Sequence, residues 1–201
     1  GKRMTKMALY ASIPVLVILI VAVTPSRDEF VMKRLEARVA AGECQPRLID
    51  ADKLAFEVVN NYYEYNIIDV RPAADYDSFH IATAINIPLE KLADPEYRNF
   101  INQRIKTNVF YGASVEDGHK ACLLARFHGN ANGLALSGTA AEFKEQFYNL
   151  EPLGDNPTRK ELTVFTFREQ AARKMTEIEA SVSSLSKPIE KKPRIIQGGC
   201  S

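Results

Sequence analysis

The stretch "YNIIDVRPAADYDSFHIATAINIP", from Tyr65 to Pro88, decides the fold. Its opening run, "YNIIDV" at 65–70, is short and apolar, which is typical of a buried β-strand. Pro72 ends that run in a turn, because proline fixes its own φ angle and has no backbone N–H to donate. The segment "ATAINIP" at 82–88 then predicts a second short strand.

The sequence on both sides of this stretch continues the alternation of strands and helices. An apolar helix is predicted at 50–63. Further along, "TNVFY" at 107–111 and "GLALS" at 133–137 predict two strands, with a helix at 119–127 between them. Short apolar strands that alternate with helices indicate a parallel sheet with helices on both faces. We therefore predict an α/β domain.

Four short motifs within residues 48–92 occur in an informative order. They are Asp69-Val70-Arg71 at the end of the first strand, Asp75-Tyr76, His80-Ile81, and the run "AINIP" at 84–88. In these motifs the chain resembles the rhodanese homology domain, which implies a rhodanese-like fold for residues 47–150. The chain departs from the family at Phe79, Ala82 and Thr83, where the family favours Gly, Pro and Gly.

Three polar residues of these motifs are interpreted as structural. Asp69, at the end of a strand, can accept hydrogen bonds from the N–H groups of a turn, and Arg71 can brace the segment that follows. His80 lies just before a predicted strand, where a histidine more often stabilises a turn than acts as a base. We assign no chemistry to any of the three.

The resemblance places the reaction of the family in the loop after the strand at 107–111. Sulfurtransferases that look like this chain have a cysteine directly after that strand, and its thiolate holds a persulfide with the help of nearby positive charge. Here that position is Gly112, and Glu116 and Asp117 would repel an anionic substrate. The related phosphatases, which use a Cys-x5-Arg loop, are excluded on the same grounds. We predict no catalytic residue and a vestigial active-site loop before a helix at His119, made of Gly112, Ala113, Ser114, Val115, Glu116, Asp117 and Gly118.

The N-terminal segment is predicted to anchor the chain in a lipid bilayer. The run from Met7 to Val23 carries no charge. As a helix it would be about 25 Å long, against a hydrocarbon core of roughly 30 Å. A cleaved secretory signal is the alternative, because a basic segment precedes the apolar run. That basic segment favours a cytoplasmic N-terminus and a domain on the outer, periplasmic-type face. A stalk at 27–46, with a helix at 28–41, joins this single-pass anchor at 1–26 to the domain.

The segment after the domain has two parts. Residues 151–186 predict a long amphipathic helix that begins with a capping box of Thr158 and Glu161. This helix either packs on its own domain or docks on a partner. Residues 187–201 contain two prolines and four cations, which favours an extended basic arm. The arm ends in "GGCS", which looks like the swinging arm of thiosulfate-oxidising carrier proteins, whose cysteine carries sulfur.

Composition and cysteine spacing exclude several classes of protein. The net charge of +1, from 26 basic and 25 acidic residues, offers no field that would attract nucleic acid. The cysteines at Cys44, Cys122 and Cys200 are too far apart for a CxxC-type site, and we predict neither a metal nor a cofactor. Cys122 is interpreted as a packed helix residue. For Cys200, a disulfide with Cys44 or a lipid or metal attachment are the alternatives to a sulfur-carrying thiol.

Two functional hypotheses from different classes follow. The first is a non-catalytic accessory or scaffolding subunit that docks on a larger membrane protein complex, with the other subunits and the bilayer as its partners. The second is a sulfur carrier, or the partner of a sulfurtransferase, that uses Cys200 as a swinging-arm thiol beside two unhindered glycines. A carrier requires Cys200 to be free and exposed, whereas a structural tail would have it bonded or packed.

Overall fold

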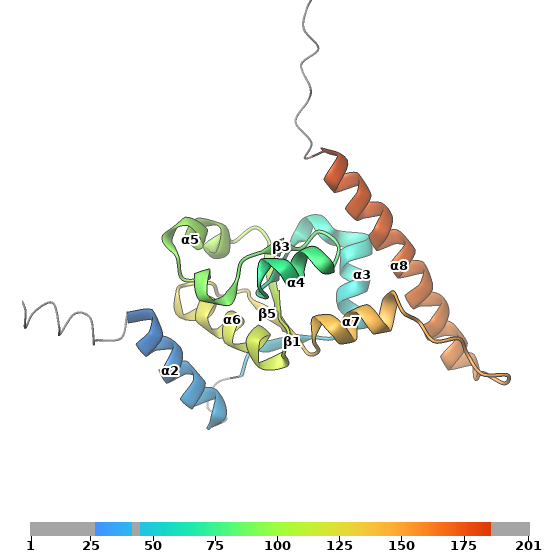
Figure 1. Cartoon of the computed structure of the whole chain (residues 1–201), viewed down its shortest axis with the longest axis horizontal. Helices are drawn as coiled ribbons and strands as arrows, with labels where there is room; N and C mark the ends of the chain where they lie inside the picture. The colour runs from blue at the N-terminus through green and yellow to red at the C-terminus, as the bar shows by residue number, and fades with distance from the viewer. Residues whose placement is uncertain (1–26, 42–44, 186–201) are drawn as a thin grey trace, which may run out of the picture.

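The computed structural model describes residues 27–41 and 45–185, and they are organised around one five-stranded parallel sheet (Figure 1). The strands lie in the order β1-β5-β4-β2-β3, and every adjacent pair is parallel. Their bounds are β1 Arg47–Ile49, β2 Tyr65–Asp69, β3 Ile85–Asn86, β4 Thr107–Tyr111 and β5 Leu134–Leu136. The α/β prediction is confirmed, and β1 is an edge strand that the sequence did not reveal.

Helices cover both faces of the sheet. One apolar cluster joins the sheet to α3, α7 and α8, and a second joins it to α2, α5 and α6 on the opposite side (Figure 1). The helices are α2 Arg27–Ala40, α3 Ala51–Asn61, α4 Ala73–Ser78, α5 Pro95–Asn102, α6 Val115–Phe127, α7 Ala140–Phe147 and α8 Arg159–Leu185, with 3-10 turns η1 Tyr62–Glu64 and η2 Leu89–Lys91. The sheet is thus buried on both faces, which explains why its central strands are apolar runs.

The order of the strands sets where a ligand would bind. The chain passes from β2 to β3 in one direction along the sheet and from β4 to β5 in the other. The carboxyl ends of β2 and β4, at Asp69 and Tyr111, are paired in register at this switch point. In open parallel sheets, ligands bind in the crevice outside such strand ends.

The long helix α8 packs on its own domain. Ala171 and Met175 are buried against α3 and α7. Arg168 donates from Nε and Nη2 to the two carboxylate oxygens of Asp52 in α3, at 2.9 and 2.8 Å. Of the two alternatives for this helix, packing is therefore observed. The outward face still exposes Leu162, so docking stays a prediction for that face alone.

Both chain ends predicted to contact other molecules lie outside the described residues. Within 27–41 and 45–185, no helix is at once long and apolar enough to cross a bilayer. The predicted anchor from Met7 to Val23 and the arm at 187–201 both fall outside these ranges. They remain predictions.

Thr83 has a backbone conformation that suits glycine. Its φ of 66° lies in the left-handed region, which costs a β-branched residue roughly 1–2 kcal/mol. The turn is held from outside, because the carboxylate of Glu179 in α8 accepts a hydrogen bond from the Thr83 N–H at 2.7 Å. Helix α8 thus stabilises the turn at which the sequence departs from the family's glycine.

We expect Thr83→Gly to raise the free energy of unfolding by about 0.5–1 kcal/mol, because relief of left-handed strain exceeds the entropic cost of a glycine. Chemical denaturation of both proteins measures the difference. Thr166→Gly, at an exposed position inside α8, should instead lower stability by roughly 0.3 kcal/mol. A loss of stability in Thr83→Gly would contradict the strain argument.

The contact between Asp52 and Arg168 should depend on pH. The hydrogen bonds from Arg168 lower the pKa of Asp52 below its ordinary value of 3.8, against an opposing effect of burial. A lowered pKa in the folded state gives stability that is present above 3.8 and is lost as the pH falls through the folded value. Asp52→Asn should therefore cost up to about 1 kcal/mol at neutral pH.

Denaturation of wild type and Asp52→Asn across a pH series checks this expectation. The stability difference should shrink steadily as the pH falls below the ordinary pKa of aspartate. Asp155→Asn, at an exposed site before α8, provides the control and should change little at any pH. A difference between wild type and Asp52→Asn that stays constant into acid would rule out the carboxylate charge as its source.

Candidate functional site

The first candidate site is the end of β4, where the sequence predicted a loop from Gly112 to Gly118. Helix α6 begins at Val115, four residues before His119, so the second half of the predicted loop is wrong. The Ser114 hydroxyl caps the helix by accepting a hydrogen bond from the Asp117 N–H at 3.2 Å. The carboxylates of the first turn also lie at the positive end of the helix dipole. These terms outweigh the poor helix propensity of Gly118.

Gly118 is explained by close packing of α6 on β4. A Cβ atom at this position would lie 3.2 Å from the Phe110 carbonyl oxygen and 3.4 Å from the Tyr111 Cα. Glycine therefore lets the first turn of the helix rest directly on the strand. Its role is packing within a helix, where the sequence suggested a loop.

Gly112 is buried at the point where that first turn closes over the strand end. A Cβ atom at Gly112 would lie 2.7 Å from Asp117 Cβ and 3.3 Å from Val70 Cγ2, and the first distance is shorter than carbon atoms tolerate. The Gly112 carbonyl oxygen accepts a hydrogen bond from Ala140 N–H at the start of α7, at 3.0 Å. The end of β4 is thus closed by α6, tied to α7, and without room for a side chain.

The residues around the closed strand end carry acidic side chains. Glu116 is exposed and Asp117 is half-buried, while Ala113 adds only a methyl group. The nearest lysine along α6, Lys120, is paired with Glu36 of α2 at 3.0 Å. Burial lowers the pKa of His119, which favours its neutral form. These residues offer no positive charge directed at the strand end.

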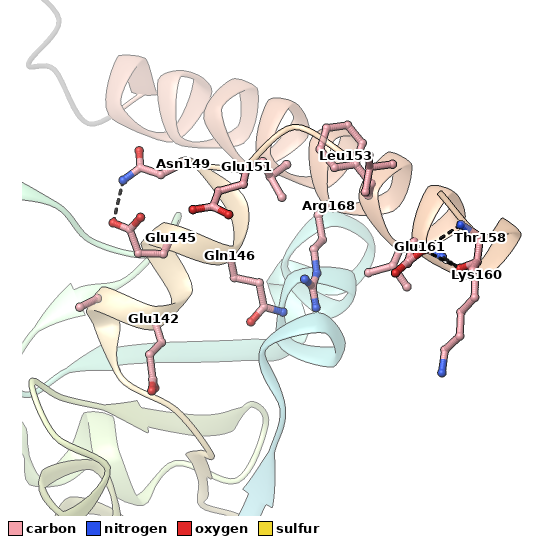
Figure 2. A pocket seen from close by; sticks show the side chains of 14 residues that line it. Glu142, Glu145, Gln146, Asn149, Glu151, Leu153, Thr158, Lys160, Glu161 and Arg168 are labelled. Carbon is pink, nitrogen blue, oxygen red and sulfur yellow. Dashed lines mark hydrogen bonds between the residues drawn. The ribbon is translucent and has the colours of Figure 1, made fainter. Parts of the chain in front are cut away.

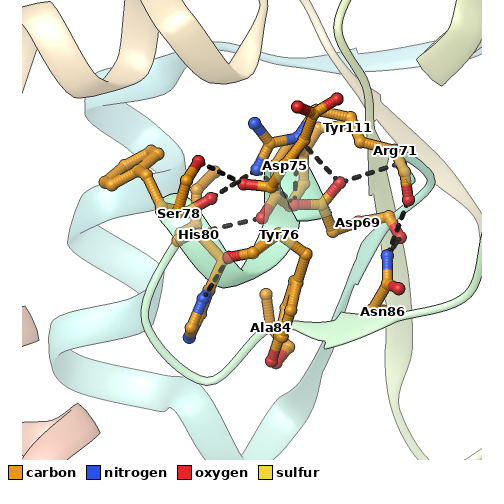
Figure 3. A network of polar contacts seen from close by, with 11 residues as sticks. Asp69, Arg71, Asp75, Tyr76, Ser78, His80, Ala84, Asn86 and Tyr111 are labelled. Carbon is orange, nitrogen blue, oxygen red and sulfur yellow. Dashed lines mark hydrogen bonds and ion pairs between the residues drawn. The ribbon is translucent and has the colours of Figure 1, made fainter. Parts of the chain in front are cut away.

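The neighbouring strand end carries a buried ion pair (Figure 3). The Asp69 carboxylate has no solvent exposure, and it accepts hydrogen bonds from the Arg71 N–H at 2.9 Å and from Arg71 Nη2 at 2.6 Å. Arg71 Nη2 also donates to the Phe79 carbonyl oxygen. The guanidinium is therefore held inward, bracing the segment after α4, and this agrees with its structural interpretation.

Two further side chains complete this network. The buried Tyr111 hydroxyl accepts a hydrogen bond from the Ile81 N–H at 3.1 Å, and burial raises the pKa of Tyr111 well above its ordinary value. His80 stacks on Tyr76 with ring centroids 4.0 Å apart, and its Nδ1 lies 2.9 Å from the Tyr76 carbonyl oxygen (Figure 3). Its Nε2 lies 3.5 Å from Glu179 of α8. Tyr111 and His80 therefore both have structural roles in this network.

The remaining predicted residues are the three cysteines. Cys122 is fully buried in α6, within the apolar cluster between sheet and helices, as predicted. Cys200 and Cys44 fall outside the described residues. Within the described ranges, no group of three or more His, Cys, Asp or Glu residues is arranged to hold a metal ion.

A second candidate site was missed by the sequence analysis. A groove of about 970 Å³ lies between α7, the segment that follows it, and the first half of α8 (Figure 2). It was missed because α7 itself was not predicted. The signal was present, since Thr139 and Glu142 form a capping box in which each side chain accepts a hydrogen bond from the backbone N–H of the other residue, at 3.1 and 2.8 Å.

Comparison with known proteins identifies the domain. Residues 54–151 match the family described as the rhodanese-like domain. The rhodanese_3 like domain of an Anabaena sp. protein is 31% identical, and the match covers 40% of this chain and 90% of that one, with a TM-score of 0.36. The chain belongs to the rhodanese-like family. No curated protein gives a significant match.

Two other solved structures are similar to part of the chain. The single-domain sulfurtransferase RDL2 of Saccharomyces cerevisiae is 19% identical, with coverage of 53% of this chain and 96% of that one and a TM-score of 0.43. A rhodanese-related protein of Thermoplasma volcanium is 24% identical, with coverage of 50% and 92% and a TM-score of 0.40.

Because the end of β4 is closed, Gly112→Ala should lower the free energy of unfolding by about 1–3 kcal/mol through overpacking. Gly154→Ala is the matched control, since nothing lies within 4 Å of a Cβ there, and it should change stability by less than about 0.5 kcal/mol. Denaturation midpoints compare the two. Gly112→Cys should be destabilised likewise and give little thiosulfate sulfurtransferase activity. Wild-type stability together with robust turnover would mean that the strand end is open.

Proposed function

We propose that this chain is a non-catalytic, membrane-anchored accessory subunit whose rhodanese-like domain docks on a larger membrane protein complex. The observation that carries the proposal is the closed end of β4, where Gly112 has Asp117 packed over it. A sulfurtransferase of this family needs a thiolate at this place, reached by an anionic sulfur donor. Here the place is filled by the protein itself.

The side chains near this end do not supply the missing chemistry. The Ser114 hydroxyl is engaged as the cap of α6, and it would not form a persulfide. Cys122 faces the buried apolar cluster, so a sulfur donor has no route to it. Arg71 is held by Asp69 and the Phe79 carbonyl, which leaves the acidic first turn of α6 to face a substrate. The acidic first turn of α6 would repel an anionic sulfur donor, which supports the proposal that the chain is not a sulfurtransferase.

The other parts of the chain supply surfaces for binding. Helix α2 is fixed to the domain by the buried side chain of Leu35 and by the ion pair between Glu36 and Lys120. A membrane anchor directly before α2 would therefore hold the domain close to the bilayer in a set orientation. On the other side, α8 presents an outward face about 40 Å long to a partner. Placement on the outer face of the membrane follows from the basic N-terminus and is part of the proposal.

The rival hypothesis, a sulfur carrier with its thiol at Cys200, is separated by one experiment. The full chain is purified gently from its native membrane, its intact mass is measured, and the co-purifying subunits are quantified. We expect an unmodified or disulfide-bonded Cys200, membrane subunits in stoichiometric amounts, and no sulfurtransferase turnover.

Variants assign any modification to its residue. Mass increases in steps of sulfur that persist in Cys44→Ser and vanish in Cys200→Ser would establish the carrier and refute the scaffolding proposal. Purification without any stoichiometric membrane partner would refute docking.

A further inference from the structure

The groove between α7 and α8 combines an apolar lining with a rim of carboxylates (Figure 2). Leu150, Leu153, Val164 and Phe165 line it and are only half-buried, so each keeps apolar surface in contact with water. Covering that surface would be favourable, at roughly 25 cal/mol per Å². The groove is therefore a binding surface for a segment that carries apolar side chains.

The charges around the groove define the segment further. Four exposed carboxylates line it, from Glu142, Glu145, Glu151 and Glu161. None of the ion pairs within the described part of the chain involves them. Of the two lining cations, Arg168 is already paired with Asp52. The occupant that fits is a cationic segment with aliphatic side chains.

The C-terminal arm of the same chain has this composition. Residues 187–201 contain three lysines and one arginine against a single glutamate, together with Ile189, Ile195 and Ile196. Pro188 and Pro193 interrupt any helix and favour an extended conformation, which suits a groove. Charge and hydrophobicity are thus complementary between the arm and the groove.

We propose that the arm at 187–201 folds back along α8 and binds in the groove between α7 and α8 of its own chain. The reach is sufficient. Leu185 is separated from Arg168 by about 26 Å of helix and from Phe165 by about 30 Å. An extended chain spans roughly 3.3–3.6 Å per residue, so it covers about 30–32 Å from Leu185 to Arg194 and about 33–36 Å to Ile195. Arg194 therefore reaches past the level of Arg168, and Ile195 past that of Phe165, with a few Å left for the turn at the end of α8.

This arrangement places the cations of the arm beside carboxylates of the groove, and its isoleucines beside the apolar lining. The cations from Lys191 to Arg194 arrive first, beside Glu145 and Glu151, which lie at the end nearer the C-terminus of α8 (Figure 2). The two isoleucines that follow meet the apolar lining. The inference is independent of the proposed function, since it concerns a contact within one chain.

Zero-length carbodiimide crosslinking of the full chain in detergent, mapped by mass spectrometry, tests this proposal. We expect crosslinks from Lys191 and Lys192 to Glu145 and Glu151, in the monomer band and at a yield that does not depend on protein concentration. The double variant Glu145→Lys and Glu151→Lys lacks the carboxylates that the reagent activates, so these crosslinks must vanish in it, which verifies their assignment. Adding Lys191→Glu and Lys192→Glu to it should restore crosslinks between the same positions, with the carboxylates now in the arm and the lysines in the groove.

A matched variant guards against a general effect of charge. Glu169→Lys with Glu177→Lys changes two exposed carboxylates of α8 that do not line the groove, and it should leave the yield within about twofold. Absence of arm-to-groove crosslinks in wild type would overturn the proposal. Crosslinks confined to a dimer band would overturn it too, since the groove would then bind a second copy. A large loss in Glu169→Lys with Glu177→Lys, which keeps both reacting carboxylates of the groove, would show that the attraction is not specific to the groove.

Discussion

The ion pair between Asp69 and Arg71 is the constraint on which the carboxyl end of β2 and its surroundings depend. Asp69 is completely shielded from water at the end of β2, and its carboxylate is stabilised by the backbone and side chain of Arg71. Removing one partner of such a buried pair costs about 3–5 kcal/mol, because the other charge is left uncompensated. The same arginine holds the Phe79 carbonyl, and Asn86 of β3 donates to the Asp69 and Arg71 carbonyls. One pair therefore joins β2, β3 and the segment after α4.

This constraint limits what the edge can do. A guanidinium committed to Asp69 and to a backbone carbonyl is not directed at a ligand beside β4. The helix dipole of α6 is likewise satisfied from within, by Ser114 and by the acidic first turn. The cation and the helix N-terminus that an anion site would use are both engaged in holding the fold. The Arg71 guanidinium and the N-terminus of α6 could either stabilise the fold or bind an anion, and here they stabilise the fold.

The sequence revealed the central elements because their burial is visible locally. Ile67, Ile68, Val109 and Phe110 are all fully buried, and this is why β2 and β4 each have an apolar centre. Helix α8 shows a capping box and an apolar stripe, and it was predicted within a few residues of its observed ends. In each case the signal lies in neighbouring residues, which is where pattern arguments are strongest.

The missed features depend on residues that are distant in the sequence. Strand β1 is three residues long and largely exposed, and it exists because β5 pairs with it across almost 90 positions of the chain. The groove requires α7 and α8 to come together. The closure over Gly112 depends on where Asp117 and Val70 lie. None of these contacts leaves a periodic trace, so the sequence identified the candidate loop without revealing that its strand end is filled.

Helix α8 is best understood as a part of the domain, because it stabilises a turn whose own residues do not favour its conformation. Where the family favours glycine, Thr83 adopts a left-handed conformation, and its N–H is bonded to Glu179 almost a hundred positions away. The same carboxylate lies beside His80, which stacks on Tyr76, so α8 reaches the segment braced by Arg71. Movement of α8 would remove the acceptor from a strained turn next to the buried ion pair. A partner that pulled α8 from the domain would break the contacts of Glu179 with Thr83 and His80. A partner that bound the outward face of α8 would break neither. Docking on α8 is therefore compatible with the fold only on the face that α3 and α7 leave exposed.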